Sequence, residues 1–181
     1  MAMAALFTQQ AVLWCCAGLL VWAAISDLRS YLIPNRICLA IVALYPIYWL
    51  AGYVGGMPVD WSGGVLAAAL LFAVGFGLFS FGLIGGGDVK LFAAVALWTG
   101  LSWLLPLLLI VGVVGGILSI SMIAAKAVML KRLPADVRAA AYPGSRFGTF
   151  RAILKNPTPY GTAIAIGGLF IIYRLLGFTL L

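Results

Sequence analysis

Residues 61–87 read WSGGVLAAALLFAVGFGLFSFGLIGGG, and this run contains no charged side chain. An α-helix rises about 1.5 Å per residue, so roughly 20 apolar residues cross the hydrocarbon core of a bilayer. The run is longer than that, and it ends directly before Asp88. It therefore predicts a membrane-spanning helix followed by a carboxylate at the membrane edge.

The rest of the chain has the same apolar character. Of its 181 residues, 65% are hydrophobic and 8% are charged, whereas about 25% of the residues of an ordinary soluble domain are charged. A soluble core of this size could not bury so much apolar surface, and a bilayer is the solvent that fits. The other charge-free runs cover residues 1–26, 37–59, 91–125 and 156–173.

The run 91–125 is too long for one upright helix. Gly100 and Pro106 offer a break near its middle, so we read two short spans, from Asp88 to about Gly100 and from about Trp103 to Ala125. The sequence then predicts an all-α polytopic membrane protein with about six transmembrane helices. We expect a single membrane-embedded domain over residues 1–181.

The basic residues predict the orientation of these spans. The net charge is +7, and with six spans the loops at about 27–36, 85–90 and 126–157 fall on one side. They hold every Lys and Arg except Arg174. The positive-inside rule places these loops in the cytoplasm and both termini outside. The positive charge is thus explained by the orientation of the spans in the membrane. We expect membrane lipids as partners of the chain, and no nucleic acid. The first run lacks the preceding basic segment of a signal peptide and is expected to stay as a span.

The chain has four acidic residues, and two of them lie at the ends of long apolar runs. These are Asp27 and Asp88, which the predicted topology brings to the same cytoplasmic edge. Each has an ordinary explanation when taken alone. Asp27 could pair with Arg29 in a hydrated loop, and Asp88 could cap a helix that starts at Val89.

Two facing carboxylates have a definite chemistry. Like charges a few ångströms apart cannot both stay ionised, so the pair shares a proton. The ionised member can activate a water molecule, and the protonated member can polarise a peptide carbonyl and protonate the leaving amine. The chain has no His and no C-x-x-C pair, which excludes a His-based triad and predicts neither a metal site nor a cofactor.

The residues around both aspartates fit a site that a peptide approaches. Gly85, Gly86 and Gly87 have no side chains, so a substrate strand could lie close to their backbone, and they permit positive φ. In the other segment, Pro34 removes a backbone donor and Asn35 can cap the second span.

Two segments of the chain resemble the bacterial type IV prepilin peptidases, in the short form of the tight-adherence (Flp) pilus type. Residues 27–35, DLRSYLIPN, look like the D-x(5)-IPN segment of these GxGD-type membrane aspartyl proteases. Residues 85–91, GGGDVKL, look like their G-x-G-D-x-K-L segment, and Pro159-Tyr160-Gly161 resembles a weaker third element.

The resemblance implies a catalytic pair and a substrate. It implies that Asp27 and Asp88 are catalytic and that the chain is an aspartic endopeptidase of the bacterial inner membrane. The substrate would be a prepilin or pseudopilin precursor, cut at the cytoplasmic face after a glycine and before its apolar helix. Nothing here resembles the paired-cysteine region of the long forms, so no methyltransferase activity is expected. The supporting residues would be Gly85, Gly86, Gly87, Lys90, Pro34 and Asn35.

Two other functions remain open at this point. A proton-coupled transporter or channel could use Asp27 and Asp88 as a relay, although such carboxylates usually lie at mid-membrane depth. A membrane scaffold would need neither carboxylate. Replacing either Asp by Asn separates these functions, because a protease would then lose its activity.

Overall fold

The structure, a computed structural model, describes residues 2–57, 59–132 and 159–180. These residues form six α-helices and no strand. Five of the helices, all except α4, are long and apolar enough to cross a membrane. The chain is therefore an all-α polytopic membrane protein, as predicted. The helices are α1 (Ala2–Ser30), α2 (Asn35–Val54), α3 (Trp61–Ser80), α4 (Gly86–Thr99), α5 (Leu104–Arg132) and α8 (Tyr160–Leu180).

The long apolar run 91–125 is divided into two helices, which confirms the predicted break. Helix α4 ends at Thr99, and Gly100 follows it with a φ of 64°. Such a left-handed conformation costs little for glycine, which has no Cβ, and it ends many helices. Helix α5 then begins at Leu104 and runs back across the bundle.

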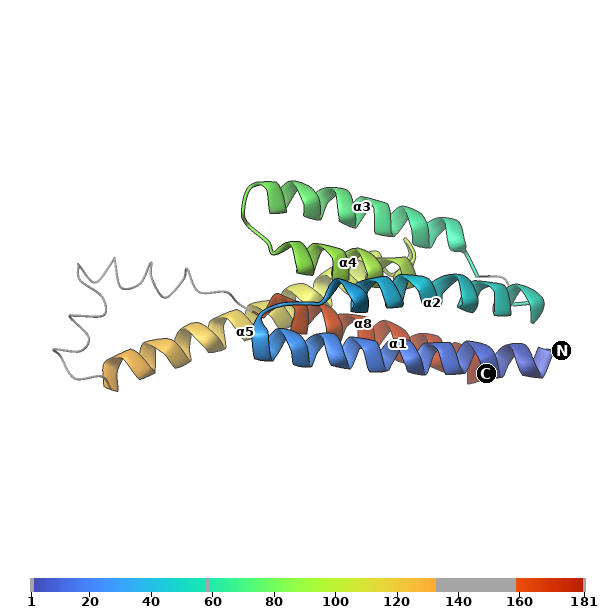
Figure 1. Ribbon diagram of the computed structural model, residues 1–181, viewed down its shortest axis with the longest axis horizontal. Helices are drawn as coiled ribbons and strands as arrows, with labels where there is room; N and C mark the ends of the chain where they lie inside the picture. Colours follow the sequence, from blue (N-terminus) through green and yellow to red (C-terminus); the bar gives the residue numbers. More distant parts are fainter. Residues whose placement is uncertain (1, 58, 133–158, 181) are drawn as a thin grey trace.

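Helix α4 is short but central in the bundle (Figure 1). It contacts α2, α3, α5 and α8, while α1 packs against α2 and α8. The two chain termini lie at one end of the bundle, and the α1–α2 and α3–α4 turns lie at the other. The basic stretches around Arg29 and Lys90 are thus opposite the termini. Which side of the membrane each end faces stays a prediction.

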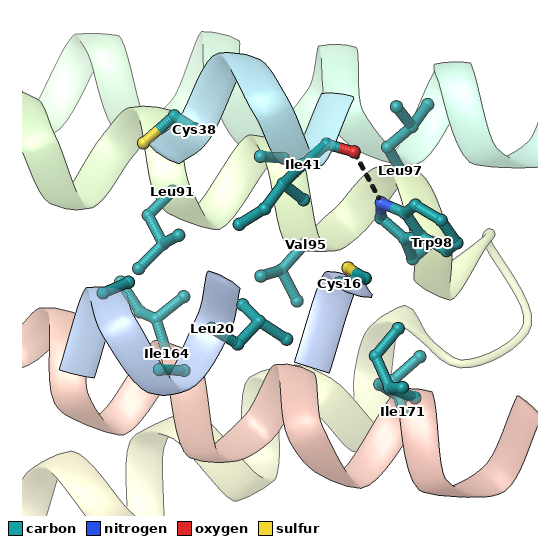
Figure 2. Packing of buried hydrophobic residues seen from close by; sticks show 14 of the residues in the cluster. Cys16, Leu20, Cys38, Ile41, Leu91, Val95, Leu97, Trp98, Ile164 and Ile171 are labelled. Carbon is teal, nitrogen blue, oxygen red and sulfur yellow. Dashed lines mark hydrogen bonds between the residues drawn. The ribbon is translucent and has the colours of Figure 1, made fainter. Parts of the chain in front are cut away.

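The core of the bundle is built around the C-terminal half of α4. Trp98 is buried and donates a hydrogen bond of 3.2 Å from Nε1 to the carbonyl of Ile41 in α2 (Figure 2). Its ring lies 5.4 Å from the rings of both Tyr45 and Tyr48, measured between centroids. A buried indole N–H without a partner would be costly, so this bond fixes how α2 and α4 sit together.

The loops of the structure are shorter than the sequence predicted. Helix α1 continues through Asp27 to Ser30, so the first turn of the 27–36 stretch is helical. Tyr31 leaves the helix with a φ of 52°. The prediction that Asn35 caps α2 is wrong, because Pro34 is the capping residue and Asn35 is the first helical residue. Proline lacks an N–H and suits a helix start, where that donor has no intrahelical partner.

The other two predicted loops differ in the same way. Helix α4 begins at Gly86, so most of the 85–90 stretch is helical. Helix α5 extends to Arg132. The rest of the 126–157 stretch, with Asp136, lies outside the described residues. Asp60, which lies between α2 and α3, caps α3 and accepts a hydrogen bond from Ser62 Oγ. That bond, together with one from the Gly63 amide, lowers the pKa of Asp60.

Candidate active site

Asp27 is held in the last part of α1 by donors from the start of α8. Its side chain is buried. Its Oδ2 accepts hydrogen bonds of 2.7 Å from the Thr162 N–H and 3.1 Å from Thr162 Oγ1. The first amides of a helix have no intrahelical partner and carry partial positive charge, so the start of α8 can hold a carboxylate here.

This contact requires a residue without a side chain at position 161. A β-carbon added to Gly161 would lie 2.9 Å from Cγ of Asp27 and 2.5 Å from Cδ1 of Ile33. Either distance is below van der Waals contact. Only glycine therefore allows α8 to begin so close to the carboxylate.

Asp88 lies in the first turn of α4, three residues after the capping residue Gly85. Its carboxylate lies beside Gly85, since a β-carbon added to Gly85 would lie 3.0 Å from Oδ2 of Asp88. Asp88 is half-buried, and the negative charge of Asp27 acts on it. Both aspartates thus lie at the same end of the bundle, Asp27 at the end of α1 and Asp88 at the start of α4.

Ile33 connects the three segments of the site. It is buried, and its side chain lies against Gly161 at the start of α8. A β-carbon added to Gly87 would lie 3.4 Å from Cβ of Ile33, which is ordinary contact. The turn that carries Ile33 is closed by Ser26, whose hydroxyl donates a 2.8 Å hydrogen bond to the Leu32 carbonyl. Ile33 therefore sets the spacing between the starts of α4 and α8.

The supporting residues are only partly arranged as the sequence suggested. Lys90 and Asn35 lie together, because Nζ of Lys90 donates a 3.0 Å hydrogen bond to Oδ1 of Asn35. Pro34 is exposed beside them. The positive φ suggested for the glycines before Asp88 is wrong. Gly85 has a φ of −71°, and the other two lie within α4, where φ is negative.

Sequence reasoning missed three residues of this site: Thr162, Gly161 and Ile33. Gly161 was quoted within the third family element, and Pro159, which directly precedes α8, is typical of a helix start. That signal locates the start of α8 but not its partner. Ile33 was quoted within the first segment, but nothing in its apolar side chain indicates a contact with two helix starts.

Comparisons with known proteins identify the family of the chain. The type IV leader peptidase family matches residues 14–120, a stretch that contains both aspartates. The prepilin leader peptidase/N-methyltransferase of Bacillus subtilis (strain 168) is 31% identical over 155 residues, which cover 84% of this chain and 51% of that protein. The chain thus spans about half the length of this curated relative. No solved structure gives a significant match. Since the family match covers more than half of the sequence, the chain belongs to the type IV leader peptidase family.

Proposed function

We propose that the chain is a membrane aspartyl endopeptidase that removes the leader of prepilin-like precursors, with Asp27 and Asp88 as its water-activating pair. The observation that carries this proposal is that Asp27 and Asp88 lie at the same end of an apolar bundle, on either side of Ile33, in a leader peptidase family member. A relay for protons across the membrane is less well supported, because both carboxylates lie at the same end of the helices.

The surroundings of the two carboxylates favour different roles. Asp27 accepts two hydrogen bonds from Thr162, and donors of this kind stabilise a charged carboxylate. Asp88 borders a largely apolar cavity. Of the two, Asp27 is better placed to carry the negative charge and act as the base. Asp88 then holds the shared proton.

The reaction can be written from these roles. Asp27 takes a proton from a water molecule while the water oxygen attacks the peptide carbonyl carbon. Asp88 gives its proton to the carbonyl oxygen, which would otherwise develop negative charge. When the tetrahedral intermediate collapses, the C–N bond breaks and the leaving amine takes the proton held by Asp27. As the new carboxyl group forms, one hydroxyl of the intermediate gives its proton to Asp88, and the pair is back in its starting state.

The start of α4 offers donors to the substrate backbone. The first intrahelical bond of α4 runs from the Val89 N–H to the Gly85 carbonyl, at 3.2 Å. The amides of Gly86 and Gly87 precede it and have no partner within the helix. These donors can bind a carbonyl of an extended substrate, which has no internal hydrogen bonds of its own. We therefore still propose that these glycines bind the substrate backbone. They do so through the free amides at the start of a helix, and not through an extended segment.

Replacement of each carboxylate tests the proposal. A prepilin-like precursor is co-expressed with the chain in a bacterium that lacks its own prepilin peptidase, and leader removal is followed by mass. Asp27→Asn and Asp88→Asn should each lower the cleavage rate about 100-fold or more, because general acid–base catalysis contributes that much. Asp60→Asn is the matched control, since Asp60 lies at the other end of the bundle. Substantial cleavage by either active-site variant would contradict the proposal.

The proposal also covers the location of cleavage and the chemical state of the product. The active site faces the cytoplasm at the bacterial inner membrane, in keeping with the basic residues near it. Methyl transfer is part of the name of the Bacillus subtilis relative, and we propose that this chain performs cleavage alone. The mature product should therefore carry an unmodified N-terminal amine. A product heavier by one methyl group would contradict this part of the proposal.

A further inference from the structure

An apolar groove lies between α2 and α3, with α4 beneath it. Both α2 and α3 pack against α4, and the space among the three helices has a volume of about 760 Å³. Helix α4 lines it with Lys90, Ala93, Ala94 and Leu97, which are spaced as on one face of a helix. The residues of α2 and α3 that line it have the same kind of spacing. Since Ala93 and Ala94 have short side chains, the groove is hollow along α4.

The groove opens to the outside of the bundle. At its edges, Leu39 in α2 and Phe72 in α3 are exposed, whereas Ala94 and Leu97 at its base are buried. Both α2 and α3 are long and apolar enough to span a membrane. Exposed apolar edges of such helices face lipid, so an acyl chain of the bilayer can enter the groove.

The charged group of the groove lies at one end, where α2 and α4 begin. Lys90 lines the groove there together with Asn35, to which it donates its 3.0 Å hydrogen bond. An ammonium group has three protons, and this bond uses one of them. Arg36 is exposed next to Asn35, and none of the described residues that line the groove carries a carboxylate. This end is therefore suited to an anionic group at the membrane surface.

The length of the groove matches one leaflet of the bilayer. Along α2 it extends from Asn35 to Pro46, which is roughly 16 Å at about 1.5 Å per residue. The hydrocarbon core is about 30 Å thick. At the far end Tyr45 reaches from α2 to α3, since a β-carbon added to Gly64 would lie 2.5 Å from its hydroxyl oxygen. A smaller hollow of about 430 Å³ follows beside Trp49. A chain of one leaflet thus fits the groove better than a helix that crosses the whole membrane.

We propose that this groove binds an anionic phospholipid, with its phosphate at Lys90 and one acyl chain along α4. Basic pockets between transmembrane helices bind anionic lipid head groups, and Lys90 lies at the basic end of the bundle. Lipid chains are as apolar as the groove itself, so the chain contributes packing and the head group contributes the selectivity. The proposal does not depend on the proposed function.

The head group is tested by lipid binding to the purified chain. Phosphatidylglycerol, which is anionic, and phosphatidylcholine, which is zwitterionic, are titrated with identical acyl chains, and bound lipid is measured by native mass spectrometry. The wild-type chain should bind phosphatidylglycerol about fivefold more tightly, since one basic residue near an anionic lipid has an effect of this size. Lys90→Gln should remove most of this preference, and Lys90→Arg, which keeps the charge, should retain it. Arg29→Gln is the matched control, because Arg29 is exposed at the same end but does not line the groove.

The acyl chain is tested by filling the groove. Ala69 is an exposed residue of α3 that lines it. Ala69→Leu should weaken the binding of both lipids about fivefold or more, because the larger side chain occupies part of the space of the acyl chain. Ala11→Leu makes the same change at an exposed position of α1 outside the groove and should have no effect.

Each of these measurements can overturn the site. Equal binding of the two lipids by the wild-type chain would do so, as would an unchanged preference in Lys90→Gln or a lost one in Lys90→Arg. Equal effects of Ala69→Leu and Ala11→Leu would also reject it. If the groove instead binds the apolar helix of a substrate, Ala69→Leu should raise KM for precursor cleavage and leave lipid binding unchanged. The Asp27→Asn and Asp88→Asn variants test the reaction separately, so the lipid site and the proposed function fail independently.

Discussion

Thr162 donates two hydrogen bonds to the same carboxylate oxygen of Asp27, across 135 positions of sequence. The Thr162 hydroxyl also lies 3.4 Å from the Ala24 carbonyl. These contacts join the last turns of α1 to the first turn of α8. They orient Asp27, so the proposed base depends on a residue that belongs to neither of the two aspartate segments.

Removal of the Thr162 hydroxyl should weaken the base. Thr162→Val keeps the shape and the N–H bond but removes the donor at 3.1 Å. A hydrogen bond to a charged group contributes about 1.5–3 kcal/mol, so cleavage should fall about 10-fold or more. Thr162→Ser keeps a hydroxyl and should restore most of the rate. A kinetic comparison of the three proteins checks this, and equal rates for Val and Thr would show that the hydroxyl has no role.

A methyl group at position 161 should displace the carboxylate. In Gly161→Ala the new β-carbon would overlap Asp27 and Ile33, and overpacking of this kind costs about 1–3 kcal/mol. We expect both thermal stability and cleavage to fall. Gly177→Ala in the same helix is the control, because a β-carbon there meets nothing within 4 Å. Similar behaviour of the two variants would show that α8 can move away from Asp27 at no cost.

Position 87 should tolerate one methyl group but not a branched side chain. A β-carbon at Gly87 would lie 3.4 Å from Cβ of Ile33, which is normal contact. Gly87→Ala should therefore be mild. Gly87→Val adds an isopropyl group between Ile33 and the start of α4 and should abolish cleavage while membrane insertion is kept. Leader removal and membrane-fraction amounts measure the two effects, and cleavage at the wild-type rate by Gly87→Val would contradict the expectation.

The pH dependence should belong to the pair of aspartates. The mechanism needs one proton shared by Asp27 and Asp88, so activity should fall at low pH, where both are protonated, and at high pH, where both are ionised. The two apparent pKa values describe the pair and not either residue. Chelators should have no effect. Activity that is lost with a chelator and restored by zinc would require a different mechanism.

Reporter fusions can assign the two ends of the bundle to the two sides of the membrane. A reporter fused after Arg132, at the end of α5, should be active on the cytoplasmic side. One fused after Leu181 should be active outside. The basic residues predict this orientation, and the termini and the α5 end point in opposite directions (Figure 1). Reporters on the same side would exclude an odd number of membrane crossings between these two points.

The sequence by itself determined the class of protein, the approximate extent of the helices and the placement of Asp27 and Asp88 at one end of the bundle. Charge-free length decides which segments can span a bilayer, because a charged group in hydrocarbon is costly. Gly100 and Pro34 mark where helices end or begin, because glycine tolerates a left-handed backbone and proline lacks an N–H. An even number of spans between Asp27 and Asp88 then returns the chain to the same side of the membrane.

Only the tertiary structure decided which residues complete the site. Thr162 is the hydrogen-bond donor to Asp27, and Ile33 lies between the start of α4 and the start of α8. Apolar periodicity does not fix how far one helix rotates or slides against another, and these contacts depend on both. The cavity beside Asp88 exists because side chains of four helices leave one space unfilled. Such a space is a property of the packed bundle, and no single segment of the sequence contains it.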